Sequence, residues 1–136
     1  MTPERMAQIH TQCFDQPRPW GTQEFTELLK SNGVYLCASK HGLAIGRVAG
    51  PEVELLTLAV EPDHRRQGIA QILMNDFETQ AKARGATDAF LEVAQSNLAA
   101  IELYQRLGFN QAGFRKDYYA GPKGMRISAS VMSKVL

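Results

Sequence analysis

The sequence predicts an α/β fold in a single domain, with helices packed on a sheet that contains at least one parallel pair of strands. Residues 54–60 (ELLTLAV) and 89–94 (AFLEVA) are nearly unbroken apolar runs, as expected for central strands covered on both faces. The stretch between them has helical spacing, and strands that alternate with helices usually form parallel pairs. The 136 residues are a usual size for one domain, so we interpret residues 1–136 as a single unit.

The composition argues against several classes of protein. The 15 Lys and Arg residues nearly balance the 14 Asp and Glu residues, and a net charge of +1 argues against direct nucleic-acid binding. No stretch is apolar enough for a membrane span, and the first residues lack the apolar core of a signal peptide. Cys13 and Cys37 occur without a CxxC motif or paired histidines. We therefore expect reduced thiols, no bound metal, and a cytoplasmic protein that does not contact a membrane.

The first half of the chain is expected to form two helices and two strands. Thr2-Pro3-Glu4 combines a capping hydroxyl, a first-turn proline and an acid, so a helix should begin there. It should end before the prolines at positions 17 and 19. A second helix is expected over residues 22–30, followed by strands over residues 34–39 and 43–49.

The second half is expected to form two further helices and two strands. After residue 68 comes a helix that ends at Gly85, with apolar residues at helical spacing: Ile69, Ile72, Leu73, Phe77 and Ala81. Another helix is expected over residues 97–107 and should end at Gly108. Two strands, near residues 109–119 and 125–135, should be joined by a turn at residues 121–124.

The segment from Arg65 to Ala70 (RRQGIA) connects the first apolar strand to the long helix. The first N–H groups of a helix lack backbone partners, and the helix dipole attracts anions there. Gly68 has no side chain where a ligand would approach the backbone. These features predict a phosphate or pyrophosphate site, although a plain helix N-terminus with exposed arginines remains the alternative. The segment is not a P-loop, because no GK[ST] follows.

Two further side chains are candidates for proton transfer. Glu92 lies inside the second apolar run, where an unpaired carboxylate would be costly to bury. It is interpreted either as a general base or as a carboxylate paired with an arginine. Tyr104 lies on the following helix among Ile101, Leu103 and Leu107, a position that by itself is more typical of a core residue than of a catalyst.

The order of these segments resembles the GNAT superfamily of acetyl-CoA-dependent N-acetyltransferases. RRQGIA fits the acyl-CoA loop pattern [QR]-x-x-G-x-[GA] of that superfamily, and Asn97 with LYQRLGF fits its second cofactor motif. The resemblance covers residues 3–120. Within the superfamily, the chain is most similar to the bacterial ribosomal-protein-alanine branch, the RimI type. The matching pieces are Pro19-Trp20, residues 58–70, residues 91–93, Ser96-Asn97 and residues 117–119.

The resemblance implies a mixed central sheet with helices on both faces and a splayed parallel strand pair that holds the pantetheine arm. It implies strand-like bonds from acetyl-CoA to Leu58, Ala59 and Val60, and a backbone N–H near Val60 that polarises the acetyl carbonyl. It further implies that the pyrophosphate and pantetheine contact Arg65, Arg66, Gln67, Gly68, Ile69, Ala70, Gln71 and Asn97. Glu92 matches the general base of the family and Tyr104 its general acid. No covalent acetyl-cysteine is required.

The acceptor implied by the resemblance is a primary amine, above all the N-terminal α-amine of a protein such as a ribosomal protein. Trp20, Tyr118 and Tyr119 would flank this peptide, unless they form an aromatic lid packed on the second helix and a strand pair. A small-molecule or polyamine acceptor is the first alternative, and a non-catalytic acyl-CoA-binding module is the second. His10, His41 and His64 are interpreted as surface residues rather than ligands.

Three features depart from the family pattern. The chain begins directly at the first expected helix, so the strand that usually opens this fold is missing or supplied otherwise. Ala94-Gln95 follows the LEV triplet, where some members have arginine. Residues 125–130 lack an acidic pair found in some relatives. These departures affect the acceptor more than the reaction.

Overall fold

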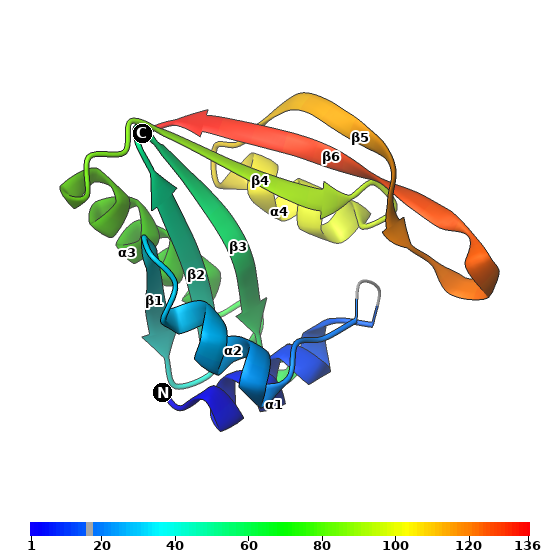
Figure 1. Ribbon diagram of the computed structural model, residues 1–136, viewed down its shortest axis with the longest axis horizontal. Coiled ribbons are helices and arrows are strands. Elements are labelled where there is room, and N and C mark those ends of the chain that lie inside the picture. Colours follow the sequence, from blue (N-terminus) through cyan, green and yellow to red (C-terminus); the bar gives the residue numbers. More distant parts are fainter. Residues whose placement is uncertain (16–17) are drawn as a thin grey trace.

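Six strands form one mixed sheet with helices on both faces (Figure 1). The computed structural model describes residues 1–15 and 18–136, apart from the side chain of Pro122. In chain order the elements are α1 (Pro3–Cys13), α2 (Thr22–Leu29), β1 (Val34–Ser39), β2 (Gly42–Ala49), β3 (Glu52–Val60), η1 (Pro62–His64), α3 (Ile69–Ala83), β4 (Asp88–Ala94), α4 (Leu98–Arg106), β5 (Asn110–Ala120), η2 (Pro122–Gly124) and β6 (Arg126–Val135). The strand order is β1-β2-β3-β4-β6-β5. No helix of the described residues is long and apolar enough to cross a membrane.

The helix starts follow the local signals in the sequence. The Thr2 hydroxyl accepts a hydrogen bond from the Arg5 N–H at 3.1 Å and caps α1. Asn97 caps α4 in the same way, because its side-chain oxygen accepts from the Ala100 N–H at 3.1 Å. Asn97 is therefore the cap that precedes the helix rather than its first residue. Of the two prolines expected to end α1, the one at position 17 lies outside the described residues.

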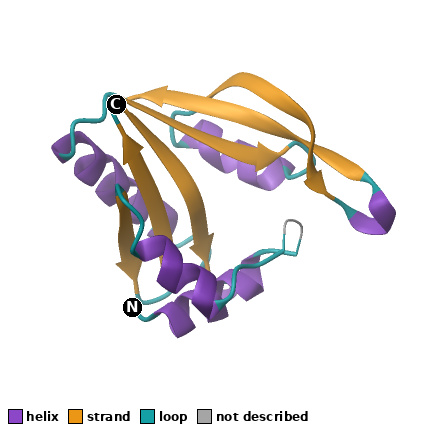
Figure 2. Ribbon diagram, viewed as in Figure 1, coloured by secondary structure: helices purple, strands orange, loops and turns teal. Residues whose placement is uncertain are grey.

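The helices cover opposite faces of the sheet (Figure 2), and one apolar cluster packs on each face. Residues of α3 and α4 form one cluster with the sheet, and residues of α1 and α2 form the other. The expected apolar stripe of α3 is wrong at one position, since the Ile72 side chain is 63% exposed. Met74 is fully buried instead, because the buried face is centred on Leu73 and Phe77, to which Met74 is adjacent on the helix.

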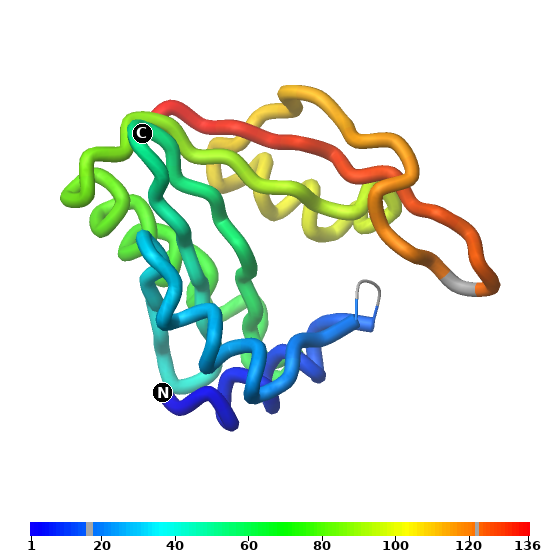
Figure 3. Tube along the Cα trace, in the orientation of Figure 1, coloured from blue at the N-terminus to red at the C-terminus, as the bar shows by residue number. Residues whose placement is uncertain are grey.

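The only parallel pair of the described sheet, β3 and β4, separates soon after it begins. Pairing is confined to Glu52 with Asp88, Val53 with Ala89 and Glu54 with Phe90. Beyond these pairs β3 follows β2, while β4 pairs with β6 along its whole length, and the two halves of the sheet diverge (Figure 1). The expected splayed pair is confirmed. The β5–β6 hairpin extends beyond α4, as the chain trace in Figure 3 shows.

A β-bulge lies in β3 where the two strands have parted. Thr57 pairs with Ile45 and Leu55 pairs with Gly46, so Leu56 is an extra residue on β3. A bulge locally bends its strand and changes the face to which side chains point. Here it brings Thr57 to the α1 side of the sheet, where its side chain contacts His10.

Gly46, opposite this bulge, generates a prediction about stability. A Cβ on Gly46 would lie 2.7 Å from the Tyr35 ring and 2.8 Å from the Phe77 ring, and both rings are buried. Gly46→Ala should therefore lower the free energy of unfolding by about 1–3 kcal/mol through overpacking. Gly113→Ala is the matched control, because a Cβ there meets nothing within 4 Å. Urea denaturation of both variants measures the difference, and equal stabilities would contradict this packing.

Candidate functional site

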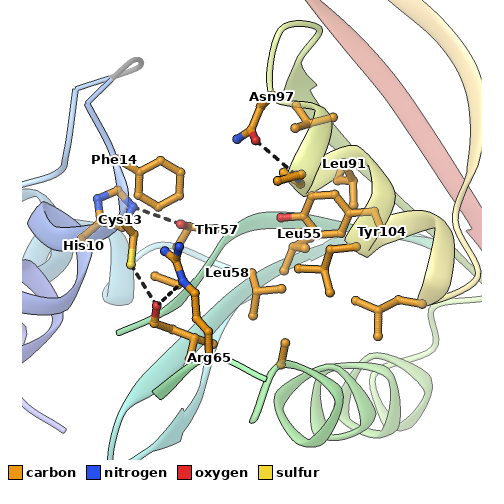
Figure 4. Close-up of a pocket in the computed structure, with 18 of the residues that line it drawn as sticks. His10, Cys13, Phe14, Leu55, Thr57, Leu58, Arg65, Leu91, Asn97 and Tyr104 are labelled. Atoms are coloured by element: carbon orange, nitrogen blue, oxygen red, sulfur yellow. Dashed lines mark hydrogen bonds between the residues drawn. The ribbon is translucent and has the colours of Figure 1, made fainter. Parts of the chain in front are cut away.

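A cavity of about 730 Å³ lies where β3 and β4 diverge (Figure 4). Its walls come from β3, β4, the start of α3, the inner face of α4, and α1 with the segment that follows it. The residues expected to bind the cofactor all line this cavity except Gln67. Glu92, Tyr104, Trp20 and Tyr119 line it as well, whereas Tyr118 does not.

The start of α3 forms a backbone wall of this cavity. Gly68 precedes the helix with a φ of +79°, and no side chain of the described residues caps the helix there. The N–H groups of residues 69–71 therefore have no intrahelical partner. A Cβ at Gly68 would meet nothing within 4 Å, so the space beside Gly68 is open, and residues 69–71 line the cavity. This arrangement can receive an anionic group.

The edge of β3 that faces the cavity has lost its strand neighbour. Leu58, Ala59 and Val60 pair with β2 on one side, but the described residues of β4 give them no partner on the other. The Val60 carbonyl accepts from the Arg65 Nε at 3.2 Å and from the Cys13 thiol at 3.3 Å. Arg65 is thus turned back onto β3 (Figure 4), and the rest of this edge can bond an extended ligand.

Tyr104 lies on α4 with its hydroxyl pointing into the cavity (Figure 4). Its half-buried ring packs edge-on against Phe109, with ring centroids 6.1 Å apart. Burial raises the pKa of Tyr104, and the neighbouring Tyr119 adds to this effect. The side chain is therefore protonated at neutral pH and can donate a proton.

Glu92 lies on β4 and its side chain is only 10% exposed. The pairing with an arginine, one of the two interpretations of this residue, is present. The Arg115 Nε lies 3.0 Å from the Glu92 Oε1. Because Glu92 also lines the cavity, its carboxylate can accept a proton there.

Of the three aromatic residues expected near the acceptor, two line the cavity and one does not. Trp20 and Tyr119 line the cavity, and burial together with the Glu92 charge raises the pKa of Tyr119 to about 12. Tyr118 is 43% exposed, and its ring lies 4.9 Å from that of Tyr119. The nearby Glu92 side chain is the main cause of the raised pKa of Tyr118. Tyr118 therefore lies close to Glu92 although it does not line the cavity.

The expectation that His10 is a surface residue is wrong. Its side chain lines the cavity and the residue is only 2% exposed. Burial lowers the pKa of His10 from 6.5 to about 4, although Glu24 opposes this shift. The spacing of the sequence could have indicated that His10 is buried. Met6, Ile9, His10 and Cys13 are at positions i, i+3, i+4 and i+7, which form one face of a helix.

The other two histidines are half-buried beside the cavity. The rings of His41 and His64 stack with centroids 3.4 Å apart, and His64 lines the cavity. The His41 Nδ1 lies 3.0 Å from the Glu61 Oε1, and this bond, with those from Gln12 and Arg5, lowers the pKa of Glu61 to about 2. Glu61 thereby connects α1 and the β1–β2 turn to the loop before α3. The described residues contain no group of three or more side chains suited to hold a metal.

Comparison with known proteins agrees with this geometry. A model of the acetyltransferase (GNAT) family matches residues 4–109. The chain is 32% identical over 136 residues to the [ribosomal protein bS18]-alanine N-acetyltransferase of Escherichia coli, which covers 97% of this chain and 91% of that protein. It is 31% identical over 132 residues to the Haemophilus influenzae enzyme of the same name, which covers 96% and 90%.

Structural similarity extends over the same region. The crystal structure of the Escherichia coli ribosomal-protein-alanine enzyme superposes with a TM-score of 0.80 at 30% identity, covering 95% of this chain and 84% of that one. A family match over most of the residues and relatives aligned over nearly all of them lead to one conclusion. The chain belongs to the acetyltransferase (GNAT) family and is an acetyl-CoA-dependent N-acetyltransferase.

Proposed function

We propose that the protein acetylates the N-terminal α-amine of a protein in the cytoplasm, by direct attack of the amine, with Glu92 as general base and Tyr104 as general acid. One observation carries the proposal: Glu92 from β4 and Tyr104 from α4 line the same cavity. The relatives named for the alanine of ribosomal protein bS18 support a similar acceptor here.

The cavity has the features that acetyl-CoA requires. The free edge of β3 at Leu58, Ala59 and Val60 suits the amides of the pantetheine arm, and the Asn97 side chain borders the same space. The N–H groups behind Gly68, with Arg66 beside them, suit the pyrophosphate. Bound acetyl-CoA supplies the acetyl group as an activated thioester.

Two side chains of the cavity can then accept and donate the protons that the transfer requires. An α-amine titrates near pH 8 and is therefore mostly charged at neutral pH, so Glu92 accepts a proton from this ammonium form, directly or through water. The amine nitrogen forms a bond to the acetyl carbon while the carbon–sulfur bond breaks. Tyr104, protonated at neutral pH, donates its proton to the departing thiolate. The second proton that the nitrogen loses as the amide forms restores the Tyr104 hydroxyl, directly or through water. Arg115 keeps the Glu92 carboxylate in place.

A polyamine or small cationic acceptor is the second candidate. Such a ligand would require several acids, yet Glu92 is the only acid among the described residues of the cavity wall, and Arg18, Arg65, Arg66 and Arg106 also line it. This charge balance favours a peptide whose single amine reaches Glu92 between Trp20 and Tyr119.

The test of the proposed function is acetyl transfer from acetyl-CoA to peptides with different first residues, measured beside free polyamines. We expect transfer to the peptide α-amine, with alanine among the accepted first residues. Transfer confined to polyamines would overturn the proposal.

The open space at Gly68 predicts the effect of a side chain there. Acetyl-CoA should raise the melting temperature of the wild-type protein, because only the folded state binds it. Gly68→Val should abolish this shift by filling the space in front of the helix amides. Gly85→Val is the control, since Gly85 also has a positive φ (+93°) and open space around its Cβ. Thermal melts that still show the full shift in Gly68→Val would locate the pyrophosphate elsewhere.

Glu92 is tested by a change of charge without a change of shape. Glu92→Gln cannot accept the amine proton and should lower kcat/KM by about 10²–10⁴-fold at neutral pH. Glu78→Gln is the control, because Glu78 has a similar exposure, 16%, and pairs with Lys134 at 2.8 Å outside the cavity. If both variants keep activity within a few-fold of the wild type, Glu92 has only a structural role.

Tyr104→Phe keeps the ring and deletes only the hydroxyl. If that hydroxyl protonates the thiolate, kcat should fall about 10²-fold, while the free energy of unfolding changes by no more than about 1 kcal/mol. Tyr35→Phe is the control, because Tyr35 donates a buried hydrogen bond to the Phe77 carbonyl at 2.7 Å outside the cavity. It should lose stability and keep kcat. A Tyr104→Phe enzyme with full kcat would exclude the acid role.

A further inference from the structure

His10 makes two hydrogen bonds that connect different parts of the cavity wall. Its Nδ1 accepts a hydrogen bond from the backbone N–H of Trp20 at 2.9 Å. Trp20 lies just before α2. Its Nε2 lies 3.0 Å from the Thr57 Oγ1, next to the extra residue of the β3 bulge. The imidazole on α1 thus connects the Trp20 segment to the central strand of the sheet. Figure 4 shows the bond from His10 to Thr57.

These two bonds specify the protonation state of the ring. A nitrogen that accepts a hydrogen bond carries no proton, so Nδ1 is bare. In the neutral ring the proton is then on Nε2, which donates to the Thr57 hydroxyl. A protonated imidazole would have a donor at both nitrogens and could no longer accept from Trp20.

Aromatic packing holds the same side chain from other directions. The His10 ring stacks with Phe14 at a centroid distance of 4.2 Å and with Trp20 at 4.9 Å, and it meets the edge of Phe25 at 5.3 Å. A phenylalanine at this position could make similar ring contacts. It could not form the hydrogen bonds to Trp20 and Thr57.

We propose that His10 is a positioning residue that fixes the acceptor side of the cavity by joining the Trp20 segment to strand β3. This role rests on the proposed function, in which Trp20 flanks the acceptor peptide. His10 does not contact the reacting atoms. It acts by holding the Trp20 backbone against the bulge at Thr57, so that the acceptor meets a wall that is already ordered.

Kinetics separate this role from packing. His10→Phe keeps the stacked ring but loses both hydrogen bonds, and should raise the KM for the acceptor peptide about tenfold, the equivalent of roughly one lost hydrogen bond. The KM for acetyl-CoA and kcat should stay within about twofold. His10→Asn places an amide oxygen near the position of Nδ1 and keeps an acceptor for the Trp20 N–H but not the bond to Thr57, so it should recover only part of the acceptor affinity. An acceptor KM in His10→Phe equal to that of the wild type overturns the proposal.

A second measurement does not depend on the acceptor. Trp20 is the single tryptophan of the chain, so its fluorescence reports on this segment alone. In native His10→Phe the emission should move to longer wavelength as the segment leaves β3, and in His10→Asn, which keeps an acceptor for the Trp20 N–H, it should move less. Unchanged emission in His10→Phe overturns the proposal. A wild-type protein that acetylates no peptide would contradict the proposed function, while this measurement would still test His10.

Acid provides a third measurement on the unmodified protein. The titratable and charged groups near the ring are Glu24 on α2, which pairs with Arg18, and the neutral Cys13 thiol one turn along α1. Below pH 6.5 the unfolded chain binds a proton at His10 that the folded protein binds only near pH 4. Stability therefore falls as the pH decreases through this window, and His10→Asn should lack this component. The Trp20 emission of the wild type should shift near pH 4 before native circular dichroism is lost. If both proteins respond identically to acid, the titration does not belong to His10 and the proposal fails.

Discussion

The separation of β3 from β4 is the constraint on which the site depends. The two strands share only three residue pairs, the last of them Glu54 with Phe90. Each strand keeps a neighbour on its other side, β2 for β3 and β6 for β4, so the sheet opens in the middle without losing its outer pairing. The opening leaves a free backbone edge on β3 beside the unpartnered amides of α3, and it exposes Glu92 to the same space as Tyr104. A parallel pair that stayed together would have filled this space with its own hydrogen bonds.

Local signals predicted the elements because they act within a few residues. The caps at Thr2 and Asn97 and the apolar runs of β3 and β4 are of this kind, and they placed the boundaries to within one or two residues. The faces of helices were harder to predict. Spacing identifies an apolar stripe, but which flank meets the sheet depends on tertiary packing. For this reason Ile72 was assigned to the stripe although it is exposed, and His10 was assigned to the surface although it is buried.

The candidate site was predictable where one continuous segment makes it and less so where distant strands meet. The RRQGIA loop carries its chemistry in its own backbone, and it borders the cavity as expected except at Gln67. The partner of Glu92 was left open, because Arg115 lies on β5, two strands away across β6. Glu92 pairs with Val131 and Arg115 with Ala129, so only the register of that hairpin brings the two side chains together. The same hairpin decides that Tyr119 lines the cavity and that Tyr118 does not.

The cysteines bear on whether an acetyl-enzyme could form. A cysteine attacks a thioester as the thiolate, so its pKa decides its reactivity. Cys13 borders the cavity, but burial raises the pKa of its thiol, which donates its proton to the Val60 carbonyl. Burial and the neighbouring Asp76 raise the pKa of Cys37 to about 12. Neither is a thiolate at neutral pH, and no histidine of the described residues hydrogen-bonds to the Cys13 sulfur. In the proposed reaction the acceptor amine needs only a proton acceptor, the role proposed for Glu92. Direct attack by the amine therefore requires no cysteine nucleophile.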